Sequence, residues 1–315
     1  MMSILLSLVG GLTLLFVGAE WLVRGSASLA ARLRISPLLI GLTVVAYGTS
    51  TPELVVSLKA GWLGNDGIAV GNVVGSNICN LGLILALACL IRPLSVQLQL
   101  LRFDVPLLIS ASALAVALLW DGELTRIEGV VLLAGIVAYT IFNMFHARQV
   151  VTAEVSDEFA AGVPDGGGTL LGQIGLVAAG LALLMAGGHL LVEGAVDLAR
   201  SQGVSEAVIG LTIVAVGTSC PELAATLVAA WRRQSDIAIG NVIGSNLYNL
   251  LGILGTAAIV NPLRMGGVHH GDLLVMSGMT LFLIPLMRTG FVLQRWEGIL
   301  MLAAYIGYLG WRWPH

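Results

Sequence analysis

Ten apolar stretches alternate along the chain with short clusters of charged residues, proline and glycine. A bilayer hydrocarbon core about 30 Å thick needs roughly 20 helical residues to cross it, and the stretches reach or approach that length. The pattern therefore predicts an all-α membrane protein. The ten expected transmembrane helices cover residues 3–23, 36–62, 67–91, 103–120, 126–146, 170–199, 205–231, 236–260, 271–287 and 292–311.

The segment between the fifth and sixth stretches is the most polar and irregular part of the chain. It carries four acidic residues and ends in three consecutive glycines, so it cannot bury enough apolar surface to span the membrane. We expect a linker there that joins two five-helix units. The resulting divisions are 1–146, 147–168 and 169–315.

Composition excludes several classes of function. Hydrophobic residues make up 57% of the chain and charged residues 10%, with a mean hydropathy of +0.95, whereas a soluble domain has about a quarter charged residues. A water-soluble enzyme is therefore excluded, and a net charge of −3 provides no basic surface for nucleic acid. The three cysteines lie in apolar stretches as small hydrophobic residues, without disulfides, and no cofactor is expected.

The distribution of Lys and Arg predicts the orientation in the membrane, because both are enriched in cytoplasmic loops. Alternate loops place ten basic residues on one side and five on the other. The richer side is expected to be cytoplasmic, so that both termini face outward and the linker lies inside the cell. The ten are Arg24, Arg32, Arg34, Arg92, Arg102, Arg148, Arg232, Arg233, Arg288 and Arg295, and the five are Lys59, Arg126, Arg200, Arg264 and Arg312.

An internal repeat relates the two units at a fixed offset of 169 residues. Residues 40–81 read IGLTVVAYGTSTPELVVSLKAGWLGNDGIAVGNVVGSNICNL, and residues 209–250 read IGLTIVAVGTSCPELAATLVAAWRRQSDIAIGNVIGSNLYNL, with 25 of 42 positions identical. Because each unit holds an odd number of spans, the second enters the membrane from the opposite side. Such inverted-topology repeats bind substrates near the bilayer midplane, so the repeat itself predicts a site.

Glu53 and Glu222 are the matched carboxylates well inside apolar stretches, where an ionised group costs at least about 2.5 to 3.5 kcal/mol. Each follows a proline, which breaks the helix and frees the carbonyl four residues earlier, at Gly48 and Gly217. A broken helix is tolerated in a membrane where it lines a cavity. We expect freed carbonyls and the hydroxyls of Thr49, Ser50, Thr218 and Ser219 to converge there with both carboxylates.

An all-oxygen site favours a hard cation. Ca²⁺ takes six to eight oxygen ligands, whereas softer metals prefer thiolate or imidazole. Two carboxylates balance one divalent ion, and the same oxygens suit several monovalent ions. A simple alternative is a proline kink whose Glu is paired with a basic residue, but no Lys or Arg lies near either Glu in its stretch.

A second duplicated motif adds polar residues to the expected site. The segments GNVVGSNICN (71–80) and GNVIGSNLYN (240–249) place polar residues every four positions on one helix face. We assign Ser76, Asn80, Ser245 and Asn249 as ion ligands. For Asn72, Asn77, Asn241 and Asn246, ion ligation and hydrogen bonding between helices remain equally open.

Three further polar residues are assigned structural roles. Glu20, His189 and Glu193 lie in the stretches that open each unit, near span ends, where long side chains can extend to the membrane surface. Glu20 and His189 occupy matched positions of the repeat but differ in charge, which argues against a shared role in ion binding.

With both motifs duplicated in the same order, the chain resembles the sodium/calcium exchanger family of the cation/calcium antiporter superfamily, in its compact prokaryotic form. The resemblance covers both units. It implies that Glu53 and Glu222 bridge a Ca²⁺ site and Na⁺ sites, with Thr49 and Thr218 adding oxygen to Ca²⁺. The flanking Na⁺ ligands it implies are Ser50, Ser76, Ser219, Ser245 and the carbonyls of Ala46 and Ala215, with Asn80 and Asn249 bordering the centre.

The resemblance implies exchange of Na⁺ for Ca²⁺ by alternating access, with more than two Na⁺ per Ca²⁺ and hence net charge movement, in a prokaryotic inner membrane and without an obligate protein partner. Many relatives, including the potassium-dependent branch, carry Asp at the position of Asn249, so its amide argues against K⁺ cotransport. A Ca²⁺/H⁺ antiporter is the nearest alternative, since a buried carboxylate can bind a proton instead of Na⁺. A cation channel is the alternative from another class.

Overall fold

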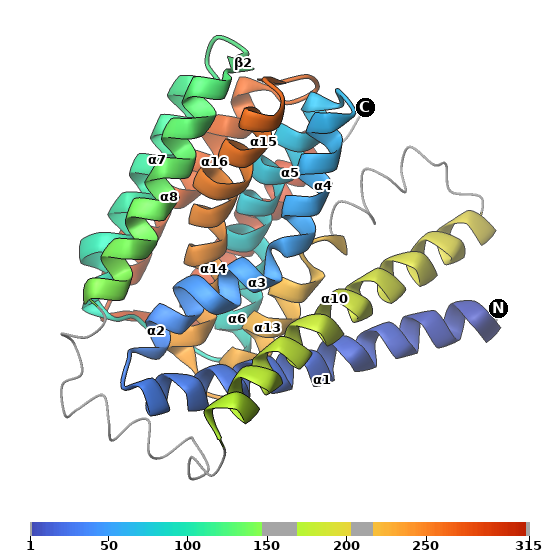
Figure 1. Cartoon of the computed structure of the whole chain (residues 1–315), viewed down its shortest axis with the longest axis vertical. Coiled ribbons are helices and arrows are strands. Elements are labelled where there is room, and N and C mark those ends of the chain that lie inside the picture. The colour runs from blue at the N-terminus through green and yellow to red at the C-terminus, as the bar shows by residue number, and fades with distance from the viewer. Residues whose placement is uncertain (1, 147–168, 203–216, 313–315) are drawn as a thin grey trace.

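The computed structural model describes residues 2–146, 169–202 and 217–312, and almost all of them are helical (Figure 1). The first unit contains, in order, α1 (Met2–Leu33), α2 (Pro37–Ile40), the π-helix η1 (Gly41–Val45), α3 (Ala46–Thr49), α4 (Thr51–Trp62), α5 (Asp66–Cys79), η2 (Asn80–Leu85), α6 (Ala86–Ile91), β1 (Leu94–Ser95), η3 (Leu100–Asp104), α7 (Val105–Leu118), β2 (Glu123–Leu124) and α8 (Arg126–His146). The described part of the second contains α10 (Leu170–Ser201), α13 (Cys220–Trp231), α14 (Ser235–Leu247), η5 (Tyr248–Ile253), α15 (Leu254–Val260), β3 (Leu263–Arg264), α16 (His270–Arg288), β4 (Val292–Leu293) and α17 (Arg295–Arg312).

The helices confirm an integral, multi-pass membrane protein. Among the described residues, seven helices are long and apolar enough to cross a bilayer, and the pair Pro37–Thr49 and Thr51–Trp62, bent by 46°, makes an eighth. The expected helix over residues 205–231 lies partly outside the described residues, and its visible part is the short apolar helix α13. The expected linker 147–168 also lies outside them.

The first helix is longer than predicted. It continues to Leu33 instead of ending at residue 23, because Ala, Leu and Arg, which favour a helix, make up most of residues 25–33. The arginine had suggested the end of the stretch, but a charged side chain does not interrupt the backbone hydrogen bonds of a helix. The matching helix α10 also runs on, to Ser201.

α1 and α10 lie side by side and cross the lower part of the bundle obliquely (Figure 1). They are antiparallel, with Gly11 opposite Gly187 and Gly18 opposite Gly180. A Cβ on Gly18 would lie 2.8 Å from the Gly180 carbonyl oxygen. The four glycines occupy matched positions of the repeat, spaced seven residues apart on each helix, so the two backbones can approach closely.

We expect Gly11→Ala to destabilise the protein by about 1 to 3 kcal/mol, as overpacking does. Its Cβ would lie 2.7 Å from the backbone nitrogen of Leu191, which cannot move aside without separating α1 from α10. Gly10→Ala is the matched control, because nothing lies within 4 Å of its Cβ. Reaction of the three buried cysteines with a thiol dye during heating measures unfolding; equal melting temperatures for both variants would contradict the close approach.

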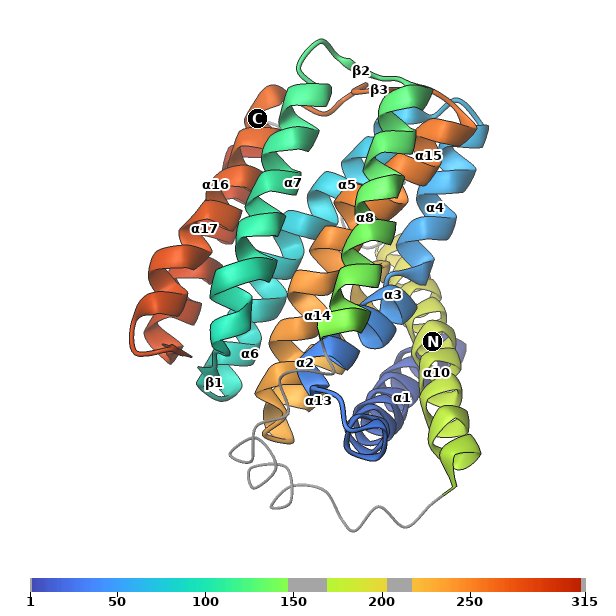
Figure 2. The same ribbon diagram turned by 60° about the vertical axis from the view of Figure 1, so that its left-hand side comes forward.

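Two short antiparallel strand pairs connect the halves. β1 pairs with β4, through Leu94 and Leu293, and β2 pairs with β3, through Leu124 and Leu263. β3 is the counterpart of β1 in the repeat, and β4 is the counterpart of β2, because the residue numbers differ by 169. The pair β1–β4 is therefore the repeat-related counterpart of the pair β3–β2. β1 lies at the bottom of the molecule in Figure 2, whereas β2 and β3 lie at the top.

The centre of the bundle is formed by the two helical spans that carry the second motif. α5, η2 and α6 form one 26-residue span, and α14, η5 and α15 form the other. Every residue from Ile237 to Leu247 in α14 is buried. Both spans contain a π-helical segment where the motif ends, at Asn80 and at Tyr248 to Asn249. π-helical turns inside helices are frequent at functional sites.

Candidate ion-binding site

Both carboxylates lie in the first turn of a helix that starts inside the bundle. The chain turns at Ser50 (φ −80°, ψ 9°) before α4 and at Ser219 (φ −89°, ψ 7°) before α13. Glu53 is 1% exposed and Glu222 is 2% exposed. The unpaired N–H groups at a helix start favour a negative charge, so each break both opens the backbone and positions a carboxylate.

The break at Ser50 rearranges the backbone hydrogen bonds. The backbone N–H of Ser50 donates to the Ala46 carbonyl at 3.0 Å. Pro52 has no N–H to offer the Gly48 carbonyl four residues earlier. The Ala46 carbonyl is the backbone oxygen that the hydroxyls of Thr49 and Ser245 contact.

The two halves exchange hydrogen bonds at the carboxylates. Ser50 Oγ donates to Glu222 Oε1 at 2.8 Å, and Ser219 Oγ donates to Glu53 Oε1 at 3.0 Å. Ser50 corresponds to Ser219 and Glu53 to Glu222 in the repeat, so each Glu accepts from the serine of the other half. The side chains of Thr49 and Thr218 also lie within hydrogen-bonding reach, Thr49 of the Glu222 carboxyl and Thr218 of the Glu53 carboxyl.

Hydroxyl groups form two equivalent clusters, one beside each carboxylate. Ser219 Oγ lies 3.4 Å from Ser76 Oγ, next to Glu53. On the other side, Ser245 Oγ donates to the Ala46 carbonyl at 3.4 Å, and Thr49 Oγ1 contacts the same carbonyl at 3.3 Å. Ala215, the counterpart of Ala46, lies outside the described residues. The clusters surround the pair of carboxylates with neutral oxygen atoms.

Asparagine side chains meet at the centre. Asn80 Nδ2 donates to Asn246 Oδ1 at 2.9 Å, and Asn246 Nδ2 approaches the Asn77 carbonyl at 3.4 Å. Several buried oxygen atoms of the site have no hydrogen-bond partner, although buried polar atoms are normally satisfied. They are Glu53 Oε2, Glu222 Oε2, Asn77 Oδ1, Asn80 Oδ1 and Asn249 Oδ1. All five are acceptors, as a cation requires.

Asn72 and Asn241 act as clamps between helices. Asn72 Nδ2 donates to the Glu53 carbonyl at 3.1 Å and to Ser57 Oγ at 2.9 Å. Asn241 Nδ2 makes the matching contacts, to the Glu222 carbonyl at 3.4 Å and to Thr226 Oγ1 at 2.9 Å. The donor groups of both amides are thereby occupied. For these two residues the structure supports the interhelical role.

Charge at the site comes from Glu53 and Glu222. Ion pairs of the described residues are formed elsewhere, as between Arg312 and Asp272 and between Arg200 and Asp197. No group of three or more His, Cys, Asp and Glu side chains gathers within residues 2–146, 169–202 and 217–312. The arrangement offers two carboxylates together with hydroxyl, amide and carbonyl oxygens, a set that suits Ca²⁺ or Na⁺ better than a soft metal.

Sequence reasoning missed some contributions. Ser57 and Thr226, which receive the asparagine clamps, are a Ser/Thr pair at the repeat offset, one turn after each Glu, and that spacing could have identified them. Glu20 was expected to extend to the membrane surface, but it is 8% exposed and paired with Arg232. These two residues lie 212 positions apart, so local sequence patterns could not relate them.

A known family matches the chain in two segments. The sequence profile described as "Sodium/calcium exchanger protein" matches residues 3–145 and 172–313. The chain belongs to this family. It is 41% identical to the putative antiporter CaxA of Alkalimonas amylolytica over 95% of each chain. It is 31% identical to the sodium/calcium exchanger MaX1 of Methanosarcina acetivorans, covering 96% of this chain and 97% of that one.

A solved structure of the sodium-calcium exchanger NCX_Mj, soaked with Na⁺ and without Ca²⁺, matches the fold with a TM-score of 0.86 and 32% identity over 98% of each chain. The exchanger family is a family of membrane transporters and not of enzymes. The resemblance inferred from the two motifs is thereby confirmed, in its compact prokaryotic form.

Proposed function

We propose that the protein is a secondary antiporter that exchanges Na⁺ for Ca²⁺ by alternating access. The observation that carries the proposal is the crossed pair of hydrogen bonds between repeat-related helices, in which each of two buried carboxylates accepts from a serine of the other half. Two negative charges balance one Ca²⁺. Because each carboxylate also borders one of the two hydroxyl clusters, Na⁺ bound in a cluster competes for the charge that holds Ca²⁺.

The ligands divide into a centre and two flanks. Glu53, Glu222, Thr49 and Thr218 bind Ca²⁺ at the centre. One flanking Na⁺ site uses Ser50, Ser245 and the Ala46 carbonyl; the other uses Ser76, Ser219 and the Ala215 carbonyl. Asn80 and Asn249 border the centre as neutral oxygens. Support comes from the crossed hydrogen bonds and from the unpartnered oxygens of both carboxylates and both amides.

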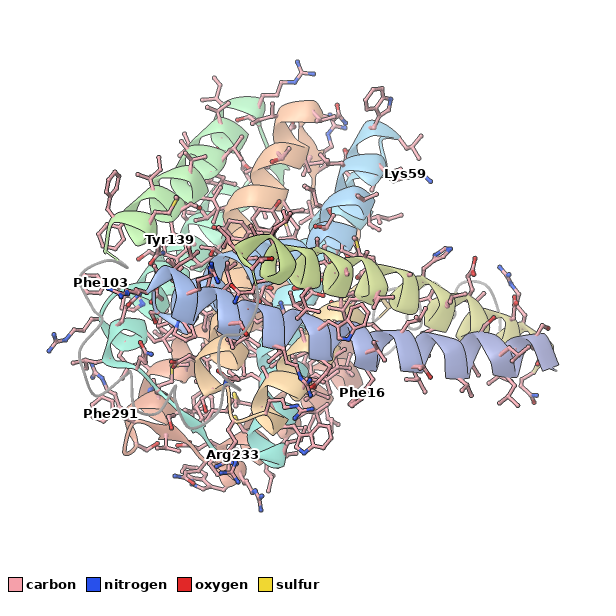
Figure 3. All side chains as sticks on the ribbon, turned by 60° about the horizontal axis from the view of Figure 1, so that its bottom comes forward. Phe16, Lys59, Phe103, Tyr139, Arg233 and Phe291 are labelled. Carbon is pink, nitrogen blue, oxygen red and sulfur yellow. The ribbon has the colours of Figure 1, made fainter. Side chains whose placement is uncertain are left out.

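The proposed architecture is ten helices in two five-helix repeats of inverted topology. The exchanged strand pairs support it, because β1 and its counterpart β3 lie at opposite ends of the bundle (Figure 2). Figure 3 likewise places Lys59, near the end of α4, and Arg233, just past the end of α13, on opposite sides of the molecule. An axis in the membrane plane would relate such halves.

The proposed orientation puts the β1–β4 end in the cytoplasm of a prokaryotic inner membrane, with both termini outside and the linker inside. Arg295 bonds to the Ile91 carbonyl at this end, whereas Arg264 lies in β3 and Arg312 bonds to the Gly267 carbonyl at the other. This separation follows the two groups of basic residues, and the cytoplasmic side is expected to hold more of them.

Electrogenic exchange is expected if more than two Na⁺ replace one Ca²⁺. Each net charge that crosses contributes about 2.3 kcal/mol per 100 mV of membrane potential, so Na⁺ entry would drive Ca²⁺ out of the cell. The amides of Asn80 and Asn249 add no charge at the centre. We therefore also propose that transport does not require K⁺.

The deciding experiment measures ⁴⁵Ca²⁺ uptake into Na⁺-loaded inverted vesicles diluted into Na⁺-free buffer, with a protonophore present. We expect uptake that persists with the protonophore, disappears when a Na⁺ ionophore collapses the gradient, and changes with an imposed potential. Uptake that requires a pH gradient would identify a Ca²⁺/H⁺ antiporter. Large Ca²⁺ currents without counter-transport would identify a channel.

A further inference from the structure

An ion pair fastens α1 to the end of α13. Arg232 Nε donates to Glu20 Oε2 at 2.8 Å, and its Nη2 contacts Glu20 Oε1. The Glu20 side chain is 11% exposed, so the pair is partly shielded from water. Arg24, one turn further along α1, also contacts the carboxylate, but this contact lies within one helix. Of these two arginines, Arg232 is the one that joins Glu20 to the end of α13.

An aromatic contact lies beside the ion pair. The rings of Phe16 and Trp231 are 6.0 Å apart, and the Arg232 guanidinium lies 5.6 Å from the Trp231 ring centre. Phe16 and Glu20 lie one helical turn apart on α1, and their partners Trp231 and Arg232 are adjacent in the chain. α1 is therefore docked on the end of α13 by one aromatic and one ionic contact.

The repeat provides the tryptophan of this docking surface twice, but its phenylalanine and its ion pair only once. The counterparts of Trp231 and Arg232 are Trp62 and Leu63 on α4, and those of Phe16 and Glu20 are Met185 and His189 on α10. Trp62 is 79% exposed and lines a surface hollow of 320 Å³ with Leu58, Lys59 and Leu63. His189 pairs with Glu193 on its own helix at 3.2 Å. Neither His189 nor Leu63 can reproduce the Glu20–Arg232 pair.

Helix α10, which is packed against α1, also packs closely against the two breaks that precede α4 and α13. Leu181 of α10 lies so close to Gly48 that a Cβ there would be 2.7 Å from it, and Val192 lies even closer to Gly217. Gly188 faces the ring of Pro221. Because α1 and α10 are closely packed, a shift of α1 along the bundle would move these contacts as well.

We propose that Glu20 and Arg232 form a one-sided latch. It favours the conformation with α1 docked on the end of α13 over the repeat-related conformation with α10 docked on the end of α4. The inference rests on the proposed alternating access, since inverted repeats exchange their conformations when the site changes face. The latch thus makes two otherwise related conformations unequal in free energy.

The test places a bimane fluorophore on Met185→Cys in the full-length protein in nanodiscs. The native cysteines are buried, so labelling is selective, and Trp62 quenches bimane when α10 docks on α4. We expect Arg232→Gln and Glu20→Gln each to raise the quenched population roughly fivefold, as loss of one well-aligned pair allows. The double variant should show no further increase. Trp62→Phe should abolish the quenching.

Arg24→Gln is the matched control, because it removes an ion pair from Glu20 without touching α13. The second readout is the ratio of the apparent Ca²⁺ affinities from the two faces, which should shift roughly fivefold in Arg232→Gln and stay unchanged in Arg24→Gln. A purely structural role would lower the amount of active protein and leave this ratio unchanged.

An unaltered ratio, or equal shifts in both variants, overturns the latch while exchange itself stands. Quenching that never responds to Na⁺ or Ca²⁺ in any variant contradicts both the latch and alternating access.

Discussion

Replacing either buried carboxylate should abolish Ca²⁺ transport. Glu53→Gln or Glu222→Gln leaves one negative charge facing a divalent ion, and loss of one partner of a buried charge pair costs about 3 to 5 kcal/mol. With a tenfold change for about every 1.4 kcal/mol, we expect Ca²⁺ affinity to fall at least about 100-fold. Na⁺-driven ⁴⁵Ca²⁺ uptake in vesicles, normalised to the amount of inserted protein, measures the loss.

Glu128→Gln is the control for these variants. Glu128 also lies in the first turn of a helix, α8, where it accepts hydrogen bonds from Thr125 far from the site. Its replacement should leave uptake near the wild-type level. If Glu53→Gln or Glu222→Gln transports Ca²⁺ at wild-type rates, that carboxylate does not bind the ion.

Removing both crossed hydroxyls should selectively weaken Na⁺ binding. Ser50→Ala and Ser219→Ala each delete an oxygen that faces a carboxylate and a flanking cluster. Hydrogen bonds to charged groups contribute about 1.5 to 3 kcal/mol, so we expect each variant to raise the half-saturating Na⁺ concentration roughly tenfold and the double variant roughly 100-fold. The measurement is ⁴⁵Ca²⁺ exchange over a series of Na⁺ concentrations.

Ser110→Ala provides the comparison. Ser110 is exposed, and its hydroxyl donates to the Pro106 carbonyl of its own helix, so its loss should not change the Na⁺ dependence. If Ser50→Ala weakens Ca²⁺ and Na⁺ binding by the same factor, the hydroxyl orients Glu222 instead of binding Na⁺.

The repeat and its chemistry could be predicted because both depend on local patterns. Pro52 next to Glu53 indicates a broken helix with a buried charge. The copy of this motif 169 residues later, at Pro221 and Glu222, indicates a second broken helix with a second buried charge. The pairing of Ser50 with Glu222, instead of the nearby Glu53, could not be predicted. Helical periodicity assigns residues to faces but does not say which face of which helix lies opposite.

The same limit explains the errors at the ends of the helices. Arg24 suggested the end of a membrane span, but α1 continues because its backbone bonds are unaffected by a charged side chain. Glu20 was assigned to the membrane surface because its partner, Arg232, belongs to a helix far away in the sequence. Contacts between distant helices decide both the burial of such a residue and its role.

The crossed pairing of the two halves also constrains biosynthesis. Residues of the first half leave the ribosome well before Ser219, β3 and β4 have been made, so Glu53 and the strands β1 and β2 enter the bilayer without their final neighbours. The Ser219–Glu53 hydrogen bond and both strand pairs can therefore form only after the helices of the second half have been inserted. A chain truncated after α14 would still carry both acidic residues, but β1 and β2 would have no strands to pair with at either surface.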